Sequence, residues 1–347
     1  MNLSHRARRD WRIFLWVSVL SATISACFAY LNNESGGSWL SAVEGIATSL
    51  AIATPLLLFE LRRDRIPPLR RLRRLPLALY FAIKVLFYAL VIVSGLLLMR
   101  YGFAGGMQPL VRLDIFFRRA LVFSIGMSLA VNLIFEFGGL LGFGTLKNLL
   151  TGRYVQPRHE QRVFLLIDMK DSTGLAERLG PVLFHELLNE FFRDITDAAL
   201  ECGAEIHKYV GDEAILTWPA DSAFEEGDCL ACPFVARGLI ARHGKTYRER
   251  FGAVPEFRAA LHFGEIVAGE IGDVRREITY VGDTLNVAAR LLDAAKTLGR
   301  EVLVSSDLLE HARLPTGLEV EKLPTLNVRG RAAPLAIAAL SSVSAAP

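Results

Sequence analysis

Four long apolar stretches in the N-terminal part constrain this chain more than any other feature. Each holds about 20 residues, enough for a helix to cross the roughly 30 Å hydrocarbon core of a bilayer. Helices of this length that are buried in globular proteins usually carry a polar stripe, which these stretches lack. The pattern predicts a membrane domain of four transmembrane helices over residues 1–142, with the helices at Trp11–Leu31, Leu40–Leu61, Pro76–Met99 and about Ala120–Leu141.

Composition supports this interpretation. Apolar residues make up 52% of the 347 residues, which is high for a wholly soluble protein. A cleaved secretory signal would explain the first stretch but not the three that follow it. The net charge of +3 is small, and the arginines gather at the ends of apolar stretches without interleaved aromatic residues. We therefore expect contact with membrane lipids and no nucleic-acid partner.

Loop charges predict the orientation in the membrane. The loop Asn32–Trp39 carries only Glu34, whereas arginines flank the first stretch on its N-terminal side and fill the loop after the second. By the positive-inside rule, the N-terminus and everything after the fourth helix lie in the cytoplasm, at the cell (inner) membrane. The loop between the third and fourth helices fits the rule less well, because it carries four arginines and one aspartate: Arg100, Arg112, Arg118, Arg119 and Asp114. The arginines that decide the orientation are Arg6, Arg8, Arg9, Arg12, Arg62, Arg63, Arg65, Arg70, Arg71, Arg73 and Arg74.

Four ionisable residues lie within or near the apolar stretches: Glu44, Glu60, Lys84 and Glu136. Charges at membrane depth are costly, so they are usually paired or functional. The first interpretation is a structural ion pair between helices, in which either Glu60 or Glu136 partners Lys84. The second is part of a signal-sensing core, and the sequence does not decide between them.

The second half has the composition and periodicity of a globular domain. We expect a linker at 143–160, a catalytic domain at 161–340 and a disordered tail at 341–347. Strands and helices begin in the order β-α-β-β-α-β, the split unit of the ferredoxin-like fold. The four cysteines have no zinc-ligand spacing and are expected to be reduced thiols. The predicted strands are Val163–Ile167, Glu205–Val210, Ala214–Trp218, Phe257–Phe263, Glu277–Val281 and Val302–Ser305, with helices at Leu175–Leu200, Phe224–Phe251 and Leu285–Leu298.

Two aspartates are expected to meet in this fold. Asp168 ends the first strand, and Asp212 lies in the turn between the second and third strands. The third strand of a ferredoxin-like sheet runs antiparallel beside the first, so the two side chains should converge. Paired carboxylates suit a hard divalent ion such as Mg²⁺. Taken singly, each aspartate could equally be a turn or cap residue.

Asn286 and Arg290 lie one helical turn apart and should share a face of the Leu285–Leu298 helix. An amide and a guanidinium that point the same way suit a sugar and a phosphoryl group. The alternative is a helix cap and a surface arginine. The short polar segment Met169–Thr173 offers backbone amides to a phosphate.

Taken together and in order, these motifs resemble the signature of the class III adenylyl cyclases. The resemblance covers about half the chain, from about Arg162 to Leu340. It rests on Ile167-Asp168 with Ser172-Thr173, on Lys208-Tyr-Val-Gly-Asp212, on Leu261-His-Phe-Gly264 with Val267-Ala-Gly269, and on Val281-Gly-Asp-Thr-Leu-Asn286-Val-Ala-Ala-Arg290.

The resemblance implies a set of site residues. Asp168 and Asp212, with Met169 beside them, would hold two metal ions, Mg²⁺ or Mn²⁺. Lys208 would read adenine together with Thr279, a position where many members carry aspartate. A guanylyl cyclase would be expected to carry an acidic residue in place of the lysine, so the resemblance favours ATP. The remaining positions are Asn286 for the ribose, Arg290 for the transition state, and Ser172, Thr173 and, more loosely, Arg331 for the phosphates.

The resemblance also implies a homodimer, because the family builds its site between two subunits and this one chain carries both halves. The dimer would form through the catalytic domain and the membrane helices. Two alternatives remain at this point. One is an inactive cyclase-like membrane scaffold, although neither metal aspartate is lost. The other is a diguanylate cyclase, since Gly211-Asp212-Glu213 resembles part of the GGDEF turn, but Val210 replaces its first glycine.

Overall fold

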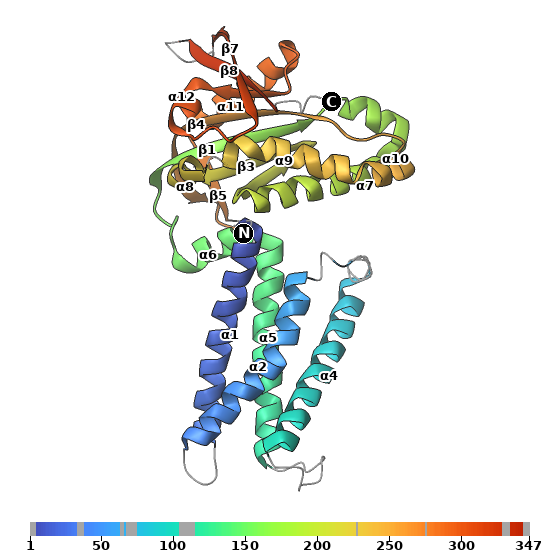
Figure 1. Cartoon of the computed structure of the whole chain (residues 1–347), viewed down its shortest axis with the longest axis vertical. Coiled ribbons are helices and arrows are strands. Elements are labelled where there is room, and N and C mark those ends of the chain that lie inside the picture. Colours follow the sequence, from blue (N-terminus) through green and yellow to red (C-terminus); the bar gives the residue numbers. More distant parts are fainter. Residues whose placement is uncertain are drawn as a thin grey trace. The chain divides into compact units, whose positions relative to one another are not determined.

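The computed structural model describes residues 5–32, 38–62, 66, 75–103, 115–226, 228–274, 276–327 and 334–342. The chain divides into two compact units (Figure 1). One unit is Ala7–Phe143, and the other is Gly144–Pro347 together with Met1–Arg6. Arg331, the arginine-rich loop after Arg62 and residues 343–347 of the expected tail lie outside the described residues.

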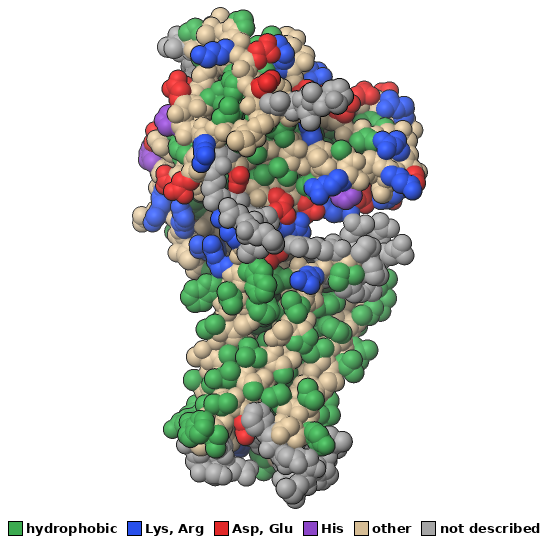
Figure 2. Space-filling model, in the orientation of Figure 1, with side chains coloured by type: hydrophobic (Ala, Val, Ile, Leu, Met, Phe, Trp, Pro, Cys, Tyr) green, Lys and Arg blue, Asp and Glu red, His purple; other side chains and the backbone are tan. Residues whose placement is uncertain are grey.

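The first unit consists of helices long and apolar enough to span a membrane. All four predicted stretches are helical, which confirms the sequence-based interpretation. Figure 2 shows hydrophobic side chains over the visible surface of this unit, as expected for helices that face lipid. The helices are α1 (His5–Leu31), α2 (Trp39–Arg62), α4 (Leu77–Phe103) and α5 (Ile115–Leu141).

A buried charged cluster joins three of these helices. The Lys84 Nζ lies 2.7 Å from Glu60 Oε1, 2.7 Å from Glu136 Oε1 and 3.0 Å from Asn132 Oδ1. The Lys84 side chain is 1% exposed, so its three N–H donors are all satisfied within the helix bundle. The interhelical ion pair predicted from the sequence is therefore present, and both glutamates take part in it.

The second unit is a mixed sheet covered by helices on both faces. The strand order is β2-β3-β1-β4-β6-β8-β7, and β5 pairs with the outer half of β4. This arrangement contains the predicted split β-α-β-β-α-β unit, with β3 and β4 both antiparallel to the central β1. The strands are β1 (Arg158–Met169), β2 (Glu205–Val210), β3 (Glu213–Pro219), β4 (Phe257–Ile271), β5 (Glu277–Val281), β6 (Val302–Ser305), β7 (Leu318–Leu326) and β8 (Leu335–Ser342).

Alternating side chains of β1 supply a separate core on each face of the sheet. Leu165 and its same-face neighbours pack against α7 (Ser172–Glu201), α9 (Asp228–Arg242) and α10 (Gly244–Phe251). Phe164 and Leu166 point the other way and pack against α11 (Asp283–Thr297). With both faces covered, β1 is rigid along most of its length, and the residue at its end is held firmly.

The structure corrects several sequence-based boundaries. The stretch 224–251 is three helices, α8 (Ala220–Glu226), α9 and α10, because the chain breaks between them. β1 and β4 are longer than predicted. Helix α12 (Ser306–His311) and strands β7 and β8 were not predicted, and β8 continues to Ser342, two residues into the expected tail. The predicted interruption of α7 is confirmed, because Gly180 has φ +72° just before Pro181.

The stretch expected to be a linker begins with a short helix and a turn, as predicted, and from Gly144 it belongs to the second unit. It consists of α6 (Phe143–Thr151), followed by Gly152 with φ +62° and then Pro157 before β1. The cysteines are free thiols, as predicted, and Cys202, Cys229 and Cys232 are buried in the catalytic unit.

Candidate active site

Asp168 and Asp212 meet where two neighbouring strands end. β3 runs antiparallel beside β1, and their register pairs Asp168 with Glu213. Asp212 precedes Glu213 in the tight β2–β3 turn, which Gly211 makes possible with φ +62°. The Asp168 and Asp212 carboxyl groups lie close enough for the charge of Asp212 to raise the pKa of Asp168. The convergence predicted from the sequence is therefore what the structure contains.

The acidic cluster has strongly perturbed titration. Burial, followed by the nearby charge of Asp212, raises the pKa of Asp168 from 3.8 to about 6. Burial and the charges of Asp168 and Asp212 raise the pKa of Glu213 from 4.5 to about 7. Crowded carboxylates of this kind gain most from a bound cation, because a cation removes the repulsion that raises their pKa values. Lys296 and Arg258 offset part of that repulsion at Asp168.

The residues present fit a divalent ion that completes its shell with substrate. Asp168 and Asp212 supply carboxylate oxygens, which hard cations prefer. Met169 contributes no side-chain ligand, because its thioether is 2% exposed and lies in the core, so only its carbonyl oxygen is available. Within the described ranges, no group of three or more His, Cys, Asp or Glu side chains is placed to hold an ion.

Ser172 and Thr173 open helix α7 immediately after the acidic strand end. Asp171, just before them, has φ +53°, the only positive φ of a non-glycine residue in the described part of the chain. This left-handed residue turns the chain sharply from β1 into the helix. Ser172 is half-buried and Thr173 is exposed. The free N–H groups at the start of α7 therefore lie within a few residues of Asp168 in the chain, a position that would suit a phosphate near the two carboxylates.

Lys208 lies on β2 and Thr279 on β5, and side-chain contacts join these two strands. The Lys208 Nζ is 2.8 Å from Glu277 Oε1, and Glu277 and Thr279 share one face of β5. Next to this pair, the His207 and Tyr280 rings contact each other with centroids 4.6 Å apart. Burial and the Lys208 charge lower the pKa of His207 to about 4, so the ring is neutral at pH 7.

Arg162, which the sequence reasoning missed, ties these strands together. Its guanidinium donates to Thr217 Oγ1 at 3.1 Å and Glu160 Oε2 at 3.0 Å, and it also bonds Glu205. It lies 5.0 Å from the Tyr280 ring centroid, a cation–π contact. Since its side chain is 2% exposed, Arg162 is a structural crosslink between β1, β2, β3 and β5. An arginine inside an otherwise apolar strand was the available signal.

Asn286 and Arg290 both lie on the exposed face of α11, while Val287 and Leu291, the residue after each of them, are fully buried. The shared face predicted from their spacing is present. Both side chains are exposed, so within one chain this pair faces solvent.

The comparisons with known proteins identify the catalytic unit. Residues 154–337 match the family model of the adenylate and guanylate cyclase catalytic domain, which covers more than half of the chain. The chain belongs to this family. The cyclase is 37% identical to adenylate cyclase 2 of Rhizobium meliloti (strain 1021) over 313 residues, which is 86% of this chain and 84% of that protein. It is 28% identical to adenylate cyclase 1 of the same strain over 179 residues, half of this chain and 26% of that protein.

Solved structures with the same fold cover just over half of the cyclase. The adenylyl cyclase CyaB of P. aeruginosa has a TM-score of 0.45 and 20% identity, over 54% of this chain and 96% of that one. The guanylyl cyclase Cya2 has a TM-score of 0.47 and 22% identity, over 55% and 96%. The family model and the similarity to adenylate cyclase 2 identify the chain as an enzyme of the class III family, and it also carries four candidate membrane helices among its described residues.

The structure adds three charged residues to the site predicted from the sequence. Two of them, Arg258 and Lys296, lower the pKa of Asp168 through their positive charge. The third, Glu213, has its own pKa raised by Asp168 and Asp212. Glu213 and Arg258 are the cross-strand partners of Asp168 on β3 and β4. Strand register was the missing information, because the sequence alone does not show that either residue pairs with Asp168.

Proposed function

We propose that this cyclase converts ATP to 3′,5′-cyclic AMP and pyrophosphate, with two Mg²⁺ or Mn²⁺ ions per site, at the interface of a homodimer. The observation that carries the proposal is the convergence of Asp168 and Asp212 at adjoining strand ends. The similarity to adenylate cyclase 2 over most of both chains supports the choice of activity.

In this proposal Asp168 and Asp212 hold the metal ions, with the Met169 carbonyl oxygen beside them. The bound ions would lower the pKa of the attacking 3′-hydroxyl and neutralise the phosphates. The N–H groups at the start of α7, near Ser172 and Thr173, would bind phosphate oxygens. Reaction requires only that the 3′-oxygen attack the α-phosphorus while pyrophosphate leaves, so positioning and charge stabilisation suffice.

Substrate choice is assigned to Lys208 and Thr279. The lysine ammonium would donate to a ring nitrogen of adenine, and the threonine hydroxyl would accept from the exocyclic amino group. Guanine presents a carbonyl oxygen where adenine has that amino group, which reverses the hydrogen-bond pattern. The pair Lys208–Glu277 lies near the surface, with side chains 37% and 50% exposed, so substrate can reach it.

The position of Asn286 and Arg290 supports a shared site. Both are exposed in one chain, so in the proposed dimer they would act on a nucleotide held by another subunit's aspartates. Asn286 would orient the ribose and Arg290 would stabilise charge at the α-phosphate in the transition state. A two-fold dimer would create two equivalent sites from one kind of chain. Arg331 would contact the terminal phosphates.

The proposal places the enzyme at the inner membrane with its N-terminus and catalytic unit in the cytoplasm, where ATP is available. The arginines that flank the first helix and follow the second support this orientation. The membrane helices would contact lipid and contribute to the dimer.

Complementation tests the shared site. Full-length Asp212→Ala and Arg290→Ala chains should each be inactive alone, because each loses one half of both sites. Co-expressed at equal amounts, half of the dimers are mixed and each mixed dimer has one intact site. Activity should therefore return to about a quarter of wild type. Arg242→Ala, another exposed arginine, is the matched control and should stay fully active.

The readout is cyclic AMP formed from ATP, with GTP supplied in a parallel assay. No recovery in the mixed population would contradict the shared-site dimer. Absence of turnover with either nucleotide in the wild type would favour the scaffold, and cyclic di-GMP from GTP would favour the diguanylate cyclase.

A further inference from the structure

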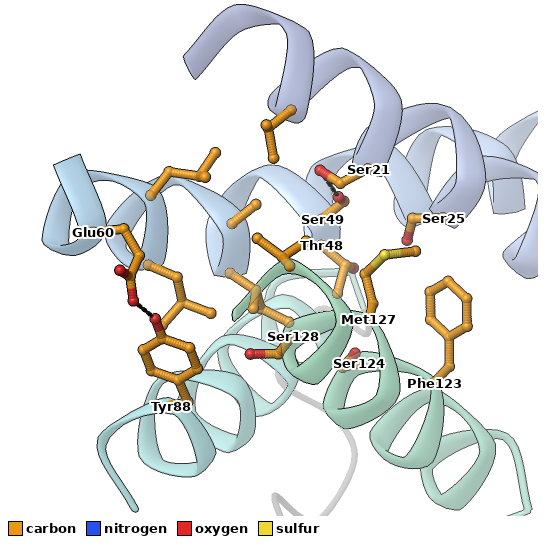
Figure 3. Close-up of a pocket in the computed structure, with 16 residues that line it drawn as sticks. Ser21, Ser25, Thr48, Ser49, Glu60, Tyr88, Phe123, Ser124, Met127 and Ser128 are labelled. Carbon is orange, nitrogen blue, oxygen red and sulfur yellow. Dashed lines mark hydrogen bonds between the residues drawn. The ribbon is translucent and has the colours of Figure 1, made fainter. Parts of the chain in front are cut away.

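Two structural features lie outside the residues assigned to catalysis. The first is a cavity of about 80 Å³ in the membrane unit, lined by hydroxyl and apolar side chains that include Ser49, Ser124 and Leu56 (Figure 3). Hydroxyl groups both donate and accept hydrogen bonds, so this lining does not select one class of ligand. The second feature is a pair of rings, His207 and Tyr280, beside the residues proposed to read the base. The geometry of this ring pair is more specific.

Lys208 and Thr279 lie on strands that are not neighbours in the sheet. The strand order places β3, β1 and β4 between β2 and β5. Direct ladder hydrogen bonds therefore do not fix the spacing of these two side chains, and contacts across the face of the sheet take that role. The Lys208–Glu277 ion pair is one such contact, but its side chains are 37% and 50% exposed, and exposed ion pairs hold a geometry weakly.

The His207–Tyr280 ring pair is a second contact between the same strands. The ring centroids lie 4.6 Å apart with 39° between the ring planes, and both side chains are half-buried. Each ring adjoins a base-reading residue, because His207 precedes Lys208 and Tyr280 follows Thr279. Burial, followed by the charge of Lys208, lowers the pKa of His207 to about 4. The imidazole is therefore neutral at pH 7 and packs against Tyr280 without repelling the lysine.

A β-bulge in β2 presents the imidazole to its partner. The register of β2 with β3 shifts between Ile206 and Lys208, which leaves His207 as the extra residue of the strand. Bulges re-aim side chains and are common next to active sites. Two consecutive residues thus serve different contacts, since His207 meets Tyr280 while Lys208 reaches Glu277.

Tyr280 is held over the central strand β1 by two further contacts. The Arg162 guanidinium lies 5.0 Å from the Tyr280 ring centroid, and the Phe164 ring lies edge-on with its centroid 5.6 Å away. Arg162 is itself fixed by hydrogen bonds to side chains of β1, β2 and β3. The tyrosine ring therefore has a firm support, and through it β5 is held relative to β2.

We propose that the His207–Tyr280 ring pair positions Lys208 and Thr279 for base recognition and so determines nucleotide selectivity. The inference rests on the proposed function, in which Lys208 donates to a ring nitrogen and Thr279 accepts from the 6-amino group of adenine. The two rings act through their neighbours in the chain and are positioning residues. Without one ring, β5 would shift relative to β2, and both hydrogen bonds could no longer form to one base.

The test compares ATP with purine riboside 5′-triphosphate, which lacks the 6-amino group that Thr279 would bind. The full-length protein in phosphatidylcholine nanodiscs is assayed with each nucleotide by pyrophosphate release. The quantity measured is the selectivity ratio, kcat/KM for ATP divided by kcat/KM for the analogue. Because both values come from the same sample, the fraction of folded enzyme cancels, and a destabilised variant still gives a valid ratio.

The variants separate the rings from general damage. Tyr280→Leu and His207→Ala each delete a ring, whereas Tyr280→Phe and His207→Phe each keep one. His311→Ala is the matched control, because it removes a different histidine ring that lies 5.3 Å from the ring centroid of Phe224.

The wild type should prefer ATP by about fivefold to tenfold, the factor expected for one hydrogen bond. The selectivity ratio should fall below about twofold when either ring is deleted, chiefly through a higher KM for ATP. The variants that keep a ring and His311→Ala should retain the wild-type preference. Thr279→Val should lower the ratio as far as ring deletion does, and adding Tyr280→Leu to it should lower the ratio no further.

A selectivity ratio that ring deletion leaves unchanged would overturn the inference and leave the proposed function standing. A further fall when Tyr280→Leu is added to Thr279→Val would also overturn it, because the ring would then act elsewhere. A wild type that releases pyrophosphate from neither nucleotide would instead overturn the proposed function, and this inference with it.

Discussion

Replacing Asp168 by asparagine should abolish catalysis and yet stabilise the metal-free catalytic unit. The Asp168 carboxyl group is partly buried beside Asp212, and both effects raise its pKa from 3.8 to about 6. At neutral pH it is therefore ionised against an unfavourable environment. At about 1.36 kcal/mol per pH unit this difference corresponds to about 3 kcal/mol. Since the carboxyl group is about half exposed, solvent screening reduces the expected gain to about 1.5 kcal/mol.

The sign depends on pH. The folded state holds the Asp168 proton more tightly than the unfolded state, so this group favours folding below about pH 4 and loses that contribution as pH rises through about 6. The Asp168→Asn gain should therefore be absent at pH 4 and complete above pH 7. For a unit of about 200 residues, 1.5 kcal/mol corresponds to about 3–6 °C in the unfolding midpoint.

The assay is thermal unfolding of the full-length protein in EDTA, followed by tryptophan fluorescence, to which the catalytic unit contributes through the buried Trp218. Added Mg²⁺ should raise the midpoint of the wild type but not of Asp168→Asn, because a ligand stabilises only the state that binds it. A lower midpoint for Asp168→Asn at pH 7.5, or an equal gain at pH 4, would refute the electrostatic account.

Three further perturbations test the supports of the site. Arg162→Met should destabilise the catalytic unit by about 3 kcal/mol in thermal unfolding, because it removes the guanidinium that pairs with the Glu160 carboxylate. Adding Glu160→Gln should recover part of the loss, and an unchanged midpoint would contradict the crosslink. Phe191→Ala should cost about 3–5 kcal/mol in the same assay, because the ring is fully buried against Phe257; a loss below 1 kcal/mol would show that the core collapses around it. Lys208→Ala should lower kcat/KM for ATP at least tenfold in steady-state kinetics, whereas Lys322→Ala, at an exposed lysine of β7, should not; equal effects would exclude a role in reading the base.

The sequence was sufficient for the features that depend on local pattern and on one rule of topology. The apolar stretches gave all four membrane helices, and the alternation of strands and helices gave the split unit that brings Asp168 and Asp212 together. The sequence could not supply the register of neighbouring strands, or which residues far apart in the chain pair across them. Glu213 and Arg258 flank Asp168 only because of how β3 and β4 align with β1.

The unpredicted C-terminal strands have a similar cause. Most residues of β7 are exposed, and its three half-buried leucines do not alternate with them, so the strand pattern is weak in the sequence alone. Pairing with β8 completes the strand. The buried ion pair, by contrast, was predictable, because apolar stretches contain few charged residues that could pair with Lys84. Lys84 could be matched to Glu60 and Glu136 from position alone.

The buried thiols of the catalytic unit have a practical consequence. Burial raises the pKa of Cys229 to about 12, and that of Cys232, packed against Cys202, is also raised. Only roughly one Cys229 in 10⁵ is then a thiolate at neutral pH, and the thiolate is the form that oxidants and maleimides attack. Turnover should persist without reducing agents, and with Cys27 replaced by serine, a single engineered cysteine on the surface of this unit would carry a fluorophore selectively.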